Sequence, residues 1–283
     1  MIDLHVHSVW SDGELTPSQL VSAAKRLGLR GIALTDHDTL AGLSKLCKAG
    51  EEQGLAVYGG VEVSCVQTDG TQLHMLIYDI PEENISIIEK LCDPIRQGRN
   101  RAVLQAAERL HQQGYPVTAE RVLAMAGPGG DLCKQFIMVQ LMDAGLCEEL
   151  YGPLYRQLFK MDENGMPGLA KLNFPNSDPA EAVRCAVRAG AKAVLAHPGQ
   201  YGNYEIVPSL VKMGLWGIEA YHPKHKEEDV RRCLELAEIY HLTVTGGSDY
   251  HGKRYGEGET LGCQGVEKAM ISGLLDIRKT GYL

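Results

Sequence analysis

Residues 1–8 read MIDLHVHS, a stretch in which apolar and polar side chains alternate. This period of two predicts a β-strand whose polar face carries both His5 and His7. Two imidazoles at alternate positions of one strand can bind a single metal ion from the same side. The opening stretch therefore predicts the first strand of the fold and part of a metal site.

Patterns typical of strands and helices alternate along most of the chain beyond this strand. Thr16 and Gln19 form a capping box at the start of a predicted helix that stops at Gly28. The turn Asp69-Gly70 predicts a hairpin. Further strands are predicted at residues 31–38, 56–80 (two strands), 191–199, 216–222 and 243–251, and further helices at 39–54, 178–190, 207–215 and 226–241. About seven strands, most of them parallel, favour a βα barrel. No GxGxxG motif follows the first strand, which argues against a dinucleotide-binding sheet.

One stretch interrupts this alternation. From about residue 83 to residue 166 the sequence predicts consecutive helices and no strand. We therefore expect a barrel formed by residues 1–85 and 167–283, with residues 86–166 as a helical insertion that covers the substrate.

Composition limits the kinds of partner and compartment. The chain has 283 residues and a formal net charge of -8, which argues against a surface that coats long nucleic acid. The eight cysteines form no CxxC pair and indicate a reducing compartment rather than a disulfide framework. The sequence shows neither a signal peptide nor an apolar run that could span a bilayer. We expect a cytoplasmic protein without a membrane partner.

Histidines and carboxylates gather at or near the ends of the predicted strands. In a parallel barrel these ends meet at one rim, so residues far apart in sequence converge on one cleft. The residues concerned are His5, His7, Asp12, His37, Glu62, His74, His197, Asp249 and His251. Imidazole and carboxylate suit Zn²⁺, Mn²⁺ or Fe²⁺. A bridging carboxylate such as Glu62 could hold two cations about 3.5–4 Å apart, the spacing of hydrolytic two-metal sites. The alternative is a hydrogen-bonded polar rim without an ion.

The motifs DLHVHS, SDG, TDHD, GVEVS, AHPG and GSDYH occur in this order and resemble those of the PHP (polymerase and histidinol phosphatase) family of metal-dependent phosphoesterases. The resemblance covers nearly the whole chain, and the helical segment is its weakest part. It implies a distorted (β/α)7 barrel with two to three divalent ions, Mn²⁺, Fe²⁺ or Zn²⁺. The subgroup that it resembles most includes bacterial 3',5'-nucleotide bisphosphate phosphatases with a helical insertion.

The same resemblance implies an assignment of ligands to the ions. The first ion would be held by His5, His7, Glu62 and Asp249; the second by Glu62, His74 and His197; and the third by Asp12, His37 and His251. Many relatives carry histidine where Asp12 stands. Asp36 and Asp38 flank His37 and are expected to orient the ligating imidazoles.

Residues outside the ligand set are candidates for contact with the substrate. His222 is a candidate proton donor to the leaving group, with a positioning role as the equal alternative. Arg99 and Lys134 are candidate partners of a second phosphate. Lys134 stands where many relatives carry arginine, and Gln200 also replaces an arginine. Lysine lacks the bidentate fork of arginine, so these departures leave the substrate open.

The sequence as a whole predicts an enzyme that hydrolyses a phosphate ester of a small molecule, with a nucleotide such as a 3',5'-bisphosphate as the main candidate. Metal ions would activate water to attack phosphorus. An exonuclease acting on short oligonucleotides and a histidinol-phosphate phosphatase are the enzymatic alternatives. A metal-dependent amidohydrolase is a further option. A metal-stabilised scaffold without catalysis is the alternative outside the enzymes.

Overall fold

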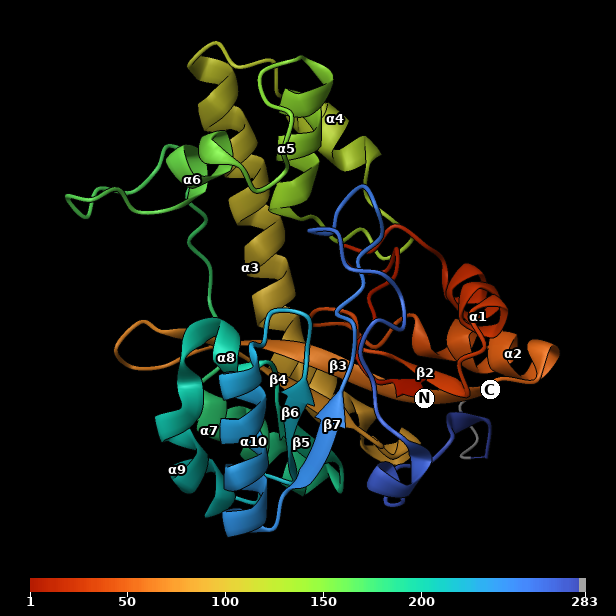
Figure 1. Ribbon diagram of the computed structural model, residues 1–283. Coiled ribbons are helices and arrows are strands. Elements are labelled where there is room, and N and C mark those ends of the chain that lie inside the picture. Colours follow the sequence, from red (N-terminus) through yellow and green to blue (C-terminus); the bar gives the residue numbers. More distant parts are fainter. Residues whose placement is uncertain (280–283) are drawn as a thin grey trace.

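Seven strands follow one another around an α/β barrel in the computed structural model of the chain, which describes residues 1–279 (Figure 1). The strands are β1 (Ile2–Asp3), β2 (Gly31–Leu34), β3 (Ala56–Val66), β4 (Gln72–Tyr78), β5 (Lys192–Leu195), β6 (Gly217–Tyr221) and β7 (Thr243–Gly246). Each strand pairs with its neighbour in sequence. Only β4 runs antiparallel to its neighbours, because the hairpin at Asp69-Gly70 reverses the chain as predicted.

The segments that follow β1 and β7 nearly close the barrel. The backbone N–H of Leu4 donates to the carbonyl of Gly246 at 3.1 Å, and that of Asp249 donates to His5 at 2.8 Å. The regular part of β1 is shorter than predicted and ends before both histidines. His5 nevertheless remains in the ladder, so the first and last strands contribute side chains to the same rim.

Helices cover the outside of the barrel. They are α1 (Pro17–Arg26), α2 (Leu43–Gln53), α7 (Pro179–Ala189), α8 (Pro198–Tyr201), α9 (Val207–Val211) and α10 (Glu227–Tyr240), with short 3-10 turns η1 (Glu82–Asn84), η2 (Asn203–Ile206), η3 (Lys268–Ile271) and η4 (Ile277–Lys279). The predicted capping box of Thr16 and Gln19 is present at α1, and the Asp178 side chain caps α7. These caps satisfy backbone N–H groups that a helix start leaves unpaired.

The helical segment consists of α3 (Ile85–Gln112), α4 (Ala119–Ala124), α5 (Lys134–Asp143) and α6 (Pro153–Phe159). Figure 1 shows α3 running from the barrel out to the other three helices. The first turns of α3 belong to the barrel core, where Ile88 and Ile95 are buried. Beyond Val103 the segment has a hydrophobic core of its own. The helix α3 is therefore a rod shared by the two cores.

No helix within residues 1–279 is both long and apolar enough to cross a bilayer.

Candidate metal centre

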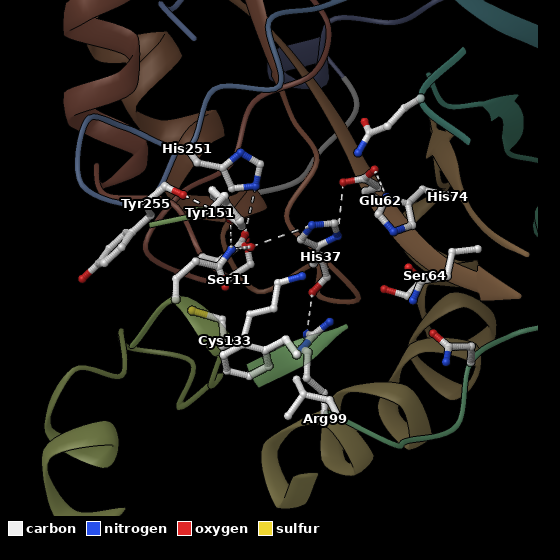
Figure 2. A pocket seen from close by; sticks show the side chains of 18 of the residues that line it. Ser11, His37, Glu62, Ser64, His74, Arg99, Cys133, Tyr151, His251 and Tyr255 are labelled. Atoms are coloured by element: carbon white, nitrogen blue, oxygen red, sulfur yellow. Dashed lines mark hydrogen bonds and ion pairs between the residues drawn. The ribbon is translucent and has the colours of Figure 1, made fainter. Parts of the chain in front are cut away.

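A cleft of about 870 Å³ lies between the rim of the barrel and the helical segment. Its floor includes His37, Glu62, His74 and His251, whose side chains point toward one another in Figure 2. Residues of the helical segment, including Arg99 and Cys133, form the facing wall in the same view. The nine predicted ligands come from segments spread over the whole barrel, and the fold brings them together at one rim.

Glu62 is the centre of this arrangement. It lies on β3, is 1% exposed, and is surrounded by imidazoles. Oε2 lies 3.2 Å from His5 Nε2, 3.1 Å from His7 Nε2 and 3.2 Å from His37 Nδ1, and Oε1 lies 2.7 Å from His74 Nδ1 and 3.0 Å from His197 Nε2. A single carboxylate with five imidazoles on its two oxygens has the geometry that a bridging ligand requires.

Asp249 approaches the same histidines from the segment that follows β7. Its Oδ1 lies 3.1 Å from His7 Nε2 and 3.4 Å from His5 Nε2. The four residues His5, His7, Glu62 and Asp249 each offer one ligand atom within 4.8 Å of all the others. These are the four residues that the family resemblance assigned to the first ion.

A second group forms around Asp12. Its Oδ1 lies 3.3 Å from His251 Nε2, and its Oδ2 lies 3.9 Å from His37 Nε2. His7 joins this group through Nδ1, 3.8 Å from Asp12 Oδ1. The structure thus brings together Asp12, His37 and His251 as the sequence proposed, and adds the other nitrogen of His7.

Many of these buried atoms lack a hydrogen-bond partner in the part of the chain that the structure describes. They are His5 Nε2, His7 Nδ1 and Nε2, Asp12 Oδ1, His37 Nδ1, Glu62 Oε2, His197 Nδ1 and Asp249 Oδ1. Each buried unpaired polar atom costs about 1–3 kcal/mol. Imidazole nitrogens and carboxylate oxygens that face one another without hydrogen bonds fit shared cations, and their chemistry suits divalent transition metals.

The electrostatics of the cluster point the same way. Burial opposes protonation of His7, but the Asp249 and Glu62 carboxylates beside its ring raise its pKa to about 10. Burial disfavours the Glu62 carboxylate, yet the neighbouring imidazoles, His37 first, hold its pKa well below its usual value. Burial lowers the pKa of His37 to about 3. Without cations the carboxylates therefore retain protons on some imidazoles, and bound metal would displace those protons.

Backbone strain is concentrated at this rim. Asp38, His197 and Asp249 have φ values of 56°, 24° and 52°. Such values are costly for residues other than glycine and persist where surrounding structure holds them. The backbone N–H of His197 donates to Glu219 at 2.9 Å, and that of Asp38 donates to the Glu62 carbonyl at 2.9 Å.

Glu219 is a site residue that the sequence did not reveal. It is fully buried on β6, and its carboxylate accepts from His5 Nδ1 at 3.1 Å. A carboxylate on the far nitrogen of a ligating imidazole fixes the ring and its tautomer. The available signal was a single acidic residue within the apolar strand WGIEAY, where an unpaired charge is costly.

Asp36 and Asp38 accept hydrogen bonds from backbone N–H groups and serine hydroxyls instead of from imidazoles. Asp36 accepts from the N–H of Ser8 and from the hydroxyls of Ser8 and Ser11, and Asp38 accepts from Ser64. Within the described residues neither carboxylate is hydrogen bonded to a ring nitrogen, so the expectation that they orient the rings directly is not met. They hold the loops that carry the histidines.

The predicted substrate contacts have different environments. His222 is buried below Asp249; its Nδ1 accepts from the Lys224 N–H at 3.1 Å, which leaves Nε2 to donate to Asp249 Oδ2 at 3.3 Å. These contacts correspond to the positioning alternative. Arg99 lines the cleft and donates to Asp38 Oδ2 at 2.6 Å and to the His37 carbonyl at 3.2 Å (Figure 2).

Lys134 begins α5 and faces the cleft. Its ammonium lies 5.4 Å from the centre of the Tyr155 ring, and that of Lys160 lies 5.9 Å from the same centre. Gln200 also lines the cleft and donates to the Tyr201 hydroxyl at 3.3 Å. The wall opposite the metal ligands therefore carries two ammonium groups that suit an anion.

Comparisons with known proteins agree with this geometry. The PHP domain family matches residues 3–123. A phosphoribosyl 1,2-cyclic phosphate 1,2-diphosphodiesterase from Eggerthella lenta is 42% identical over 252 residues, which cover 89% of this chain and 94% of the relative. A 3',5'-nucleoside bisphosphate phosphatase from Chromobacterium violaceum is 29% identical over 263 residues, which cover 91% of this chain and 88% of the relative. A solved structure from Bifidobacterium adolescentis, described as a metal-dependent phosphoesterase, is 30% identical with a TM-score of 0.87, covering 97% of this chain and 95% of that one.

Proposed function

We propose that this chain, which belongs to the PHP family of metal-dependent phosphoesterases, is a phosphodiesterase. Its substrate would be a cyclic phosphate diester of a phosphorylated ribose. Metal-dependent hydrolysis of a phosphate ester is supported above all by one observation: five imidazoles converge on the two oxygens of Glu62 at the base of a cleft. The substrate is that of the relative with 42% identity, which the chain matches over 94% of its length.

The metal content is part of the proposal. Three ions would be held, the first by His5, His7, Glu62 and Asp249, the second by Glu62, His74 and His197, and the third by Asp12, His37 and His251. Mn²⁺, Fe²⁺ and Zn²⁺ all suit these donors. Bound divalent cations would supply a nucleophile from water at neutral pH and offset charge on the phosphate oxygens.

The remaining residues of the cleft have their own tasks. His222 holds the Asp249 carboxylate in place through its Nε2–H. Arg99 ties the helical segment to the His37 loop through Asp38. Lys134 faces the cleft and makes no ion pair with a carboxylate among the described residues. Its ammonium is therefore available to a second phosphate of the substrate.

The helical segment, residues 86–166, would act as a cap over this cleft. Its residues form the wall opposite the metal ligands, so a bound substrate would lie between the segment and the barrel. A covered cleft together with a net charge of -8 favours a small phosphorylated molecule over long nucleic acid. All eight cysteines are free thiols, which supports a reducing compartment such as the cytoplasm.

A nucleoside 3',5'-bisphosphate is the second candidate substrate. It is supported by the relative with 29% identity and by the same positively charged wall. Hydrolysis of a bisphosphate releases inorganic phosphate from a monoester, whereas a cyclic diester is first opened to a monoester. The two reactions are therefore distinguishable by their products.

The test compares substrates at one metal concentration. Purified protein loaded with Mn²⁺ would be assayed with phosphoribosyl 1,2-cyclic phosphate, a nucleoside 3',5'-bisphosphate, a dinucleotide and a 20-nucleotide RNA, with and without a chelator. We expect the highest kcat/KM for the cyclic phosphate and loss of all activity on chelation. A higher kcat/KM for the bisphosphate would make it the substrate instead, and no hydrolysis by protein with confirmed bound metal would refute the proposal.

A further inference from the structure

One side chain of the helical segment reaches the metal ligands themselves. Gln135 is the second residue of α5, and its Nε2 donates to Oδ2 of Asp12 at 3.0 Å. Both side chains are buried, with 5% of Gln135 and 7% of Asp12 exposed. The two residues are 123 positions apart in sequence, so this contact exists only because α5 docks against the barrel.

The orientation of the Gln135 amide follows from its partners. Asp12 presents its two carboxylate oxygens to the ring nitrogens of His251 and His37, at 3.3 Å and 3.9 Å. An ionised carboxylate only accepts hydrogen bonds, so the NH₂ group of the amide must face it. The second hydrogen of the same NH₂ group is directed to the Tyr151 hydroxyl at 3.0 Å.

The two oxygens of Asp12 therefore differ. Oδ2 is held by Gln135, whereas Oδ1 faces His251 Nε2 at 3.3 Å and has no hydrogen-bond partner among the described residues. Within residues 1–279, the other side chains that approach the Asp12 carboxylate are the imidazoles of His7, His37 and His251, at 3.3–3.9 Å. Because an amide is neutral, it orients the carboxylate without cancelling the charge that attracts a cation.

The same contact extends to the loop that follows His251. The Tyr151 hydroxyl, which accepts from Gln135, donates to the carbonyl of Tyr255 at 3.4 Å. Asp12 and the loop after His251 are thus connected through one amide and one phenol, both contributed by the helical segment.

The loop that leads into α5 is docked tightly enough to fix this position. A Cβ at Gly127 would lie 1.7 Å from the carbonyl oxygen of Val9, and Asn100 bonds the loop through Gly130 and Leu132. The start of α5 therefore has little freedom to move away from Asp12.

From these contacts we propose that Gln135 is a positioning residue for the third metal ion, so that the helical segment sets the affinity of this ion as well as covering the substrate. The inference rests on the proposed role of Asp12 as a ligand. Loss of the Gln135 donor leaves Oδ2 of Asp12 buried and unpaired, which frees the carboxylate to turn away from His251 and His37.

The test measures metal binding directly. Wild type, Gln135→Leu and Gln135→Asn would be equilibrated with a series of free Mn²⁺ concentrations, and bound Mn²⁺ counted by elemental analysis. Outer partners of metal ligands typically contribute about 10–100-fold in affinity, so we expect the dissociation constant of one ion to rise by about that factor while the others stay unchanged. Gln135→Asn keeps the amide but shortens the side chain by one methylene group. It replaces the leucine variant in the binding measurement if the leucine variant does not fold.

Gln140→Leu is the matched control. Gln140 is a buried glutamine of the same helix, and its Oε1 accepts from the Thr118 N–H at 3.1 Å, away from the metal ligands. It should match wild type in Mn²⁺ binding. Binding curves for both Gln135 variants that coincide with wild type and with Gln140→Leu would overturn the inference. Hydrolysis is assayed separately. A wild-type protein that binds Mn²⁺ but hydrolyses no phosphate ester would refute the proposed function, while the comparison of Mn²⁺ binding among the variants would remain valid.

Discussion

Nδ1 of His5 lies 3.1 Å from Oε1 of Glu219, while Nε2 of the same ring lies 3.2 Å from Oε2 of Glu62. The imidazole is thus held between a carboxylate that orients it and the carboxylate that we propose as its partner in binding the first ion. Glu219 also accepts from the backbone of His197, so one buried side chain positions two of the proposed ligands.

Replacing this carboxylate tests its effect on metal binding. Glu219→Gln keeps the shape of the side chain but removes its charge, so the His5 ring becomes a weaker ligand. We expect Mn²⁺ affinity and activity to fall by about 10–100-fold. Glu205→Gln is the control, because the Glu205 side chain is 90% exposed and pairs with Arg232 at the surface. Equal Mn²⁺ affinity in the two variants would show that Glu219 does not act on the metal.

Asp249→Ala distinguishes an enzyme from a metal-stabilised scaffold. The Asp249 carboxylate faces His5, His7 and His222, and its removal should disrupt the first ion. For a catalytic centre we expect kcat/KM to fall by about 10²–10³-fold or more, which is the scale of removing one essential electrostatic group. The thermal midpoint, measured in parallel, should fall by only a few degrees. A large drop in stability with kcat/KM preserved in the folded fraction would favour the scaffold.

The stability of the protein in chelator should depend on pH differently from the stability of the protein loaded with Mn²⁺. Burial opposes protonation of His7, but the Asp249 and Glu62 carboxylates raise its pKa to about 10, above its ordinary value of about 6.5. A histidine with a raised folded-state pKa contributes stability that is complete below pH 6.5 and is lost as the pH rises toward 10. Thermal melts in chelator across this range should show the decline.

Metal binding should show the opposite trend. Ligating imidazoles must lose their protons, so apparent Mn²⁺ affinity should rise with pH over the same interval, with protons released on binding. Isothermal titration in buffers of different ionisation enthalpy measures that release. Binding that releases no protons at pH 7 would contradict the protonated state assigned to His7.

The role of Lys134 predicts a change in KM rather than in kcat. Lys134→Met removes a positive charge from the cleft wall while leaving the metal ligands intact. If the ammonium binds a phosphate equally in the ground and transition states, KM rises and kcat is unchanged. We expect an increase of about tenfold, since one hydrogen bond to a charged group is worth about 1.5 kcal/mol. Lys45→Met, an exposed lysine on α2, should have no effect on KM.

Much of the fold, and the convergence of the candidate ligands on one rim, could be predicted because the signals are local. The Asp69-Gly70 turn specifies a hairpin through its own backbone preferences, and the alternation around His5 and His7 places both rings on one side. Strand ends of a barrel meet at one rim whatever the loop lengths, so His197 and Asp249 could be assigned to the same cleft as Glu62.

Other features depend on contacts between distant segments and carry no local signal. Gln135 resembles any other helical residue, and its contact with Asp12 depends on how α5 docks. His222 follows a strand as the ligands do, and only its burial below Asp249 separates it from residues that face the cleft. The short β1 has a similar cause, because Leu4 and His5 pair with the chain after β7.

The closure of the barrel by the segments after β1 and β7 has a consequence for synthesis of the protein. His5 and Asp249 belong to the same group of candidate ligands, although 244 positions separate them in the sequence. During synthesis this group cannot assemble until residue 249 has been added. Products that terminate before residue 249 would lack it, so they should bind Mn²⁺ more weakly than chains that include this residue.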